Sequence, residues 1–198
     1  MATPAAAPLP AETPVTPRPE PKPLPEAADS FTDPQILGIV DQACGKLVVE
    51  STLARSNALS PEVRSFAGDM AADYAAYRER QDALGKRIEM SPAPSDTRLM
   101  IGVGTENDML SLMRLDATVF DKAFLAQVVA DHDYLIDLLE GRLLDDIDRS
   151  EIRALIESDL RDKLTKNRAR ARELDAGTTK DIAREVPAPY QHWPRPPR

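Results

Sequence analysis

Residues 60–88 carry the feature that most constrains the fold, an apolar stripe whose steps alternate between four and three residues. Ser60 and Pro61 are typical of a helix start, because serine caps a helix and proline fits its first position. The stripe consists of Val63, Ala67, Met70, Tyr74, Tyr77, Gln81, Leu84 and Ile88. This spacing places the side chains along one seam, so it predicts a long helix in a left-handed bundle.

The segment before it predicts a second long helix. Thr32 or Asp33 is the expected N-cap, Pro34 the first helical residue, and the helix ends at about Ser56. Its apolar residues again recur every three or four positions: Ile36, Val40, Ala43, Leu47 and Ala54. The single cysteine, Cys44, lies in this run, so we expect a small buried thiol and no internal disulfide.

The second half of the chain predicts two more long helices. One runs over about residues 120–144, and the other begins at a capping box, residues 148–151, and ends near Gly177. Residues 96–116 contain two glycines and predict a looser turn with a short helix. No stretch has the alternation of a strand. Four helices of roughly 24 residues with unequal connections predict an all-α helical bundle.

Proline marks the expected domain boundaries. Ten of the 18 prolines lie in residues 1–34 and five in residues 187–197. We therefore expect a Pro-rich extended or disordered tail at 1–31, a bundle at 32–176, and a second tail at 177–198. The second tail carries Tyr190 and Trp193, and aromatic residues among prolines suit docking on a protein partner. A solvated end that lies on its own domain is the alternative.

Charge and hydropathy exclude several classes of protein. The net charge of -8 argues against nucleic acid or an anionic membrane as a partner. No window approaches the roughly 18 apolar residues of a transmembrane segment. The N-terminus lacks the pattern of a signal peptide. The protein is therefore expected to be periplasmic or envelope-associated if a signal has been removed, and cytoplasmic otherwise.

Two segments resemble the domain-of-unknown-function family 4142. They are "SPEVRSFAGDMAADY" and, later, "FDKAFLAQVVADHDYLIDLLEG". Family members typically read Asn-Pro-Glu-Val-Lys-x-Phe-Ala-x-x-Met-x-x-Asp-His, then Phe-Asp-x-x-Tyr-x-x-x-x-Val-x-Asp-His. The resemblance covers about residues 34–175. It implies a ferritin-like four-helix bundle and an exported bacterial protein, often periplasmic or lipid-anchored, with no settled biochemical role.

This chain departs from the family pattern at the residues that could bind metal. Tyr74 stands where the family has histidine in the second helix. Leu47 stands at the place of a first-helix glutamate, and the nearest acid is Glu50. In the fourth helix, Thr165, Lys166 and Asn167 lie near the place of one or two histidines.

The remaining donors do not make a di-metal centre. Such a centre needs a glutamate from each of two helices and a Glu-x-x-His pair from each of the other two, and this chain has no Glu-x-x-His. We therefore expect no catalytic residue, no cofactor and no metal. A single transition metal on His132, Asp131, Asp73 and Glu50 is the weaker alternative. The simpler reading is a core histidine: His132 and Tyr74 both face inward, so we expect them in one layer, bonded directly or through water.

These observations favour a non-enzymatic function. The first hypothesis is an extracytoplasmic bundle that serves as a structural, binding or assembly module of the bacterial envelope. The second is a storage or oxidase-type protein that binds iron, manganese or zinc. The third is an accessory subunit that docks on a larger complex through its Pro-rich tails.

Overall fold

The computed structural model describes residues 30–178 of the 198-residue chain. Within this range every regular element is helical and none is a strand, so the predicted all-α class is confirmed. The long helices are α1 (Asp33–Asn57), α2 (Pro61–Arg87), α3 (Asp96–Met113), α4 (Ala117–Leu138) and α7 (Arg161–Thr178). Shorter pieces extend α4 and precede α7, namely the π-helix η1 (Leu139–Leu143), α5 (Leu144–Asp146), α6 (Ser150–Leu155) and the π-helix η2 (Ile156–Leu160).

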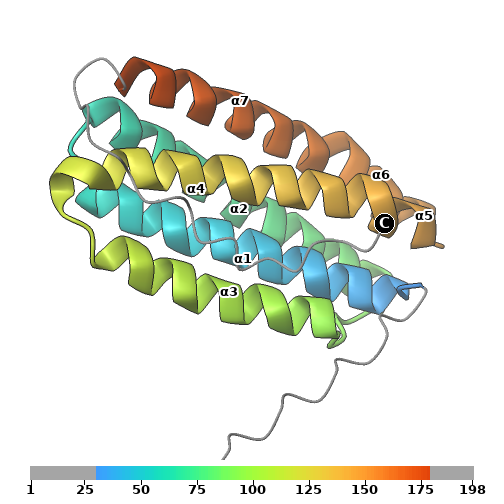
Figure 1. Ribbon diagram of the computed structural model, residues 1–198. Coiled ribbons are helices and arrows are strands. Elements are labelled where there is room, and N and C mark those ends of the chain that lie inside the picture. Colours follow the sequence, from blue (N-terminus) through green and yellow to red (C-terminus); the bar gives the residue numbers. More distant parts are fainter. Residues whose placement is uncertain (1–29, 179–198) are drawn as a thin grey trace, which may run out of the picture.

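The helices form two antiparallel hairpins, α1 with α2 and α4 with α7 (Figure 1). Helix α3 lies between them in the sequence and packs mainly on α1, at the edge of the bundle (Figure 1). It carries the chain back along the bundle, so α2 and α4 run in the same direction. Four helices with one long crossover are the topology of ferritin-like bundles.

The core is built from the predicted stripes. Seven of the eight side chains of the α2 stripe, from Val63 to Leu84, are buried, and Ile88 is half-buried. The stripe of α1 is buried along its whole length. The start of α1 also agrees, with Thr32 as N-cap, although Pro34 is the second helical residue and not the first.

Helix α3 corrects the prediction of a loose turn and a short helix. It has 18 residues and begins at the N-cap Ser95, whose hydroxyl accepts a bond from the Arg98 N–H at 3.1 Å. Its glycines lie inside the helix and do not end it. Gly104 is buried, and Gly102 lies close to the Gln42 side chain of α1. Packing on α1 therefore outweighs the low helix propensity of glycine.

The connection from α2 to α3 crosses α1 at a glycine. A Cβ atom on Gly38 would lie 2.2 Å from the Ala93 carbonyl oxygen, so only glycine admits this approach. The Ala93 N–H donates to the Pro34 carbonyl oxygen at 2.7 Å. These contacts fix where α3 begins relative to α1.

The predicted capping box at Asp148–Glu151 is wrong. Helix α6 begins at Ser150, and its N-cap is Arg149, which makes no side-chain capping bond. The backbone N–H groups of Asp148 and Arg149 instead donate to the Asp33 carboxylate of α1, at 3.0 and 3.1 Å. A carboxylate from another helix thus supplies the acceptors that a local box would have supplied.

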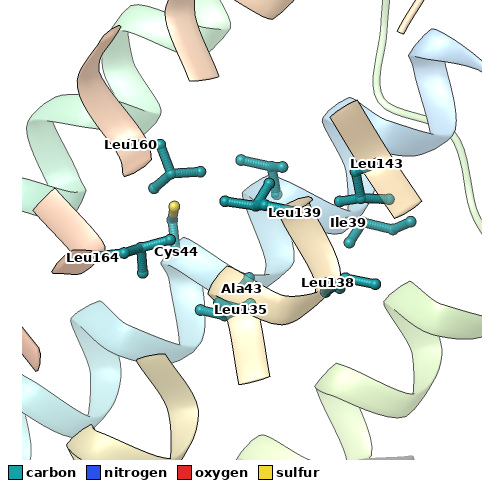
Figure 2. Close-up of a pocket in the computed structure, with 10 residues that line it drawn as sticks. Ile39, Ala43, Cys44, Leu135, Leu138, Leu139, Leu143, Leu160 and Leu164 are labelled. Atoms are coloured by element: carbon teal, nitrogen blue, oxygen red, sulfur yellow. The ribbon is translucent and has the colours of Figure 1, made fainter. Parts of the chain in front are cut away.

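The predicted third and fourth long helices are present, and each contains a π-helical turn. An apolar pocket lies where these turns face α1, and Figure 2 shows its lining side chains. Leu139 and Leu143 come from η1, Leu160 comes from η2, and Cys44 comes from α1. Cys44 is buried, as predicted, and burial raises the pKa of its thiol above the ordinary value. A thiol in this state is poorly reactive.

None of the described helices has the length and apolar character required to span a bilayer. The predicted Pro-rich tails lie outside the described residues, apart from a few positions next to the bundle. The predicted domain boundaries stay a prediction.

Candidate functional site

A cluster of buried charges joins α1, α3 and α4. The ammonium group of Lys46 contacts carboxylates of Glu50, Asp108 and Asp131, with Nζ at 2.6 Å from Asp108 Oδ2 and 3.1 Å from Asp131 Oδ2. All four side chains are at most 2% exposed. A buried charge is stable only when it is paired and hydrogen-bonded, and Lys46 meets both conditions.

Gln127 of α4 ties two of these carboxylates together. Its Nε2 donates to Asp131 Oδ1 at 2.9 Å and to Asp108 Oδ2 at 3.2 Å. Gln127 lies one helical turn before Asp131, so both reach the same face of α4. The cluster therefore links the outer helix α3 to the bundle through Asp108.

The cluster changes the pKa of its own members. Burial lowers the pKa of Lys46, but the charges of Asp131, Glu50 and Asp108 together outweigh it and raise that pKa above the ordinary value. Burial and the charge of Asp131 raise the pKa of Glu50 well above its usual range, although Lys46 acts against them. The lysine is therefore held in its charged form, and Glu50 keeps its proton to higher pH than a solvated glutamate.

A second, neutral network occupies the side of the bundle where α2, α4 and α7 meet. The Tyr74 hydroxyl lies 2.7 Å from His132 Nε2, and His132 Nδ1 lies 2.7 Å from the Val128 carbonyl oxygen. Asn167 Nδ2 donates to the Tyr74 hydroxyl at 3.3 Å. The prediction that Tyr74 and His132 share a layer is thus confirmed, and of the two predicted alternatives the bond is the direct one.

These bonds fix the protonation of His132. A carbonyl oxygen only accepts, so Nδ1 carries the proton, and Nε2 accepts from the Tyr74 hydroxyl. Burial lowers the pKa of His132 to about 4, although the bond to Val128 and the charge of Asp131 act in the opposite direction. The imidazole is therefore neutral at physiological pH, with both nitrogens bonded within the protein.

Comparison with known proteins gives one result. The family model for the domain of unknown function DUF4142 matches residues 18–174. The chain belongs to the DUF4142 family. No curated protein and no solved structure matches it.

The weak metal-ligand candidates in this DUF4142 chain lie in three different places. Glu50 and Asp131 lie together, but around Lys46. His132 belongs to the tyrosine network. Asp73 is near the surface, where it accepts from Lys163 Nζ at 2.9 Å. Across residues 30–178 no group of three or more His, Cys, Asp or Glu side chains is arranged to hold a metal ion.

A ferritin-like metal centre does not fit these residues. A cation among Glu50, Asp108 and Asp131 would have to displace the ammonium of Lys46, which already makes contacts with all three. A cation on His132 would have to compete with Tyr74 for Nε2. Possible metal ligands are therefore present, but the carboxylates already contact Lys46 and His132 Nε2 already accepts from Tyr74.

Sequence reasoning missed two members of the charged cluster, Lys46 and Asp108. Glu50 was named as the acid nearest to Leu47, and it also continues the apolar stripe of α1, three residues after Leu47 and four before Ala54. Asp108 has the same kind of signal, since it lies seven residues after the buried Ile101 on α3. The spacing indicates that Asp108 and Ile101 share a buried face only if residues 96–116 form one continuous helix.

Proposed function

We propose that this DUF4142 protein is a non-enzymatic helical bundle that serves as a structural or binding module of the bacterial envelope. The observation that carries the non-enzymatic part is the Lys46 ammonium group, which lies among three buried carboxylates. In this interior a side chain of the protein supplies the positive charge that a metal ion would supply elsewhere. Lys46 thus occupies the position among these carboxylates that a bound cation would have to take.

Hydrogen-bond geometry supports the same proposal. A catalytic acid or base has to reach a substrate, and a pocket must lead to it. His132 and the charged cluster are fully buried, and their side chains bond to one another or to the backbone. The pocket in Figure 2 is lined by aliphatic side chains and Cys44, so it offers no acid or base. A larger and more open pocket between α1 and α2 does contain acids, but Asp41 and Asp82 there pair with Arg78 and Lys86.

The envelope location rests on the resemblance to exported proteins of this family. Proline-rich composition in residues 1–31 suits a tether, which would let the bundle reach a partner at some distance from its attachment point. Both Pro-rich ends are also the proposed docking segments for a protein partner. Limited proteolysis with and without cell-envelope extract tests the docking, since equal trimming rates would contradict it.

Metal analysis tests the proposal that the interior of the bundle binds no metal ion. Protein purified without chelator should contain iron, manganese and zinc only far below one atom per chain, and a chelator should leave its melting temperature unchanged. The matched control is His132→Ala, whose metal content should equal that of the wild type. One atom of metal per chain that disappears in His132→Ala would favour the metal-binding alternative.

A further inference from the structure

Most of the large hydrophobic side chains that are exposed on the described surface lie on the outer face of α3. Among residues 30–178 six large hydrophobic side chains are exposed, and four of them belong to this one helix. They are Leu99 (65% exposed), Val103 (50%), Leu110 (44%) and Met113 (64%). Helix α3 lies at the edge of the bundle, so no other described helix covers this face (Figure 1). We call these four residues the α3 seam.

Spacing shows that the α3 seam has the geometry of a helix-packing surface. With Glu106 included, its positions follow one another at steps of four, three, four and three residues. This is the spacing of a coiled-coil contact. The residues by which α3 packs on its own bundle lie on the opposite side: Ile101, Gly104, Asp108 and Leu112. Helix α3 therefore has two packing faces, and the bundle uses only one.

We infer that the α3 seam binds a second copy of this chain, with the two α3 helices side by side and antiparallel. The inference deepens the proposed function, because it names a partner for a binding module. A symmetric dimer uses the same patch twice, so the patch must complement itself. An apolar seam at coiled-coil spacing meets this condition for its hydrophobic part.

Charges at the two ends of α3 specify the direction of the pairing. Asp96 lies at the start of the helix and Arg114 directly after its end, and both side chains are exposed. In an antiparallel pair each Asp96 comes beside Arg114 of the second copy, and symmetry gives two such contacts. In a parallel pair like charges would meet at both ends. The antiparallel arrangement also sets Leu99 against Leu110 of the second copy.

Glu106 interrupts the seam at its centre. A polar residue at such a position lowers the stability of a helix pair but restricts its register. In the antiparallel register that pairs Asp96 with Arg114, Glu106 faces Val103 of the second copy and not another glutamate. The interruption therefore weakens the dimer without opposing its geometry.

Analytical ultracentrifugation of the full chain over a concentration series tests the dimer. The wild type should sediment as a concentration-dependent dimer, and V103E/L110E should raise the dissociation constant at least about tenfold. E106L should lower it by roughly the same factor. The matched control is Leu59→Glu, an exposed leucine in the connection between α1 and α2, which should leave the constant unchanged. Circular dichroism should show equal helix content in all variants.

A charge exchange tests the antiparallel direction. D96R and R114D should each weaken the dimer, because each places like charges together, and D96R/R114D should restore it. A wild type that stays monomeric at every concentration overturns the inference, as does a dimer that V103E/L110E leaves intact. Failure of the double exchange to restore binding overturns the antiparallel pairing. None of these outcomes depends on the metal content of the protein. A failure of the dimer is therefore distinguishable from a failure of the proposed function, which metal analysis tests.

Discussion

The interior of this bundle contains two polar networks, and each provides partners for buried polar side chains in a different way. Asp131 and His132 are neighbours on α4, yet Asp131 joins the charged cluster with Lys46, and His132 joins the neutral network with Tyr74. Consecutive residues on a helix point about 100° apart, so one dipeptide serves two sides of the bundle. The first network places one ammonium group among buried carboxylates. The second keeps its groups neutral and pairs each donor with an acceptor.

The comparison shows that the two networks should respond differently to the loss of one member. Removing one side of an ion cluster leaves uncompensated charge in a medium of low dielectric. Removing one member of a neutral network leaves an unpaired dipole, which costs less. The order of the expected effects follows from this difference.

Lys46→Met should have the largest effect. Methionine fills a similar volume, but it leaves the buried carboxylates without their cation, so we expect a loss of about 3–5 kcal/mol in the free energy of unfolding. Urea denaturation followed by circular dichroism measures the loss. Lys86→Met is the matched control, since Lys86 pairs with Asp82 four residues away but is 76% exposed. It should change the free energy by less than about 1 kcal/mol.

If Lys46→Met were no more costly than Lys86→Met, the charged cluster would contribute nothing that a surface pair does not. A buried ion cluster would then not be the more sensitive of the two networks.

Acid should act with opposite signs on His132 of the neutral network and on Glu50 of the charged cluster. The pKa of His132 is lowered from 6.5 to about 4 in the folded state, so its contribution to stability is present above pH 6.5 and is lost as the pH falls towards 4. The expected loss is about 3 kcal/mol. The pKa of Glu50 is raised, so its contribution is present below its unfolded value of 4.5 and is lost as the pH rises.

Urea denaturation at a series of pH values between 4 and 7 separates the two effects. Relative to the wild type, H132Q should lose less stability on acidification, and E50Q should lose more. H192Q is the control, because His192 is the chain's other histidine and lies outside the described residues. An unchanged pH dependence in H132Q would show that His132 is not held neutral by the fold.

The sequence predicted the neutral network better than the charged one, for a physical reason. Tyr74 and His132 lie on regular seams of two long helices, and inward-facing positions at matching heights can be paired from periodicity alone. The charged cluster depends on α3, whose glycines lower its helix propensity, and on Lys46, whose long side chain reaches inward from beside the seam. Both depend on tertiary packing, which local pattern does not encode.

The start of α6 also shows that tertiary packing supplies partners that the local sequence does not reveal. The local residues suggest a capping box, but Asp33 from the far end of the sequence supplies the acceptors. Long-range carboxylates recur in this fold, since Asp121 of α4 accepts from the backbone N–H groups of Leu59 and Ser60 before α2. Single-sequence patterns predict which residues need partners more reliably than they predict the partners.

Asp133→Asn should have the smallest effect, although Asp133 lies only two residues after Asp131. Its carboxylate contacts Arg168 at 2.7 Å and Arg172 at 2.9 Å, but it is 41% exposed and water can replace both contacts. We expect a change below about 1 kcal/mol that shrinks further at high salt. Asp131→Asn is the matched comparison and should cost several times more, because it removes a charge from the buried partners of Lys46. Equal costs for the two substitutions would mean that burial does not decide what a carboxylate contributes on α4.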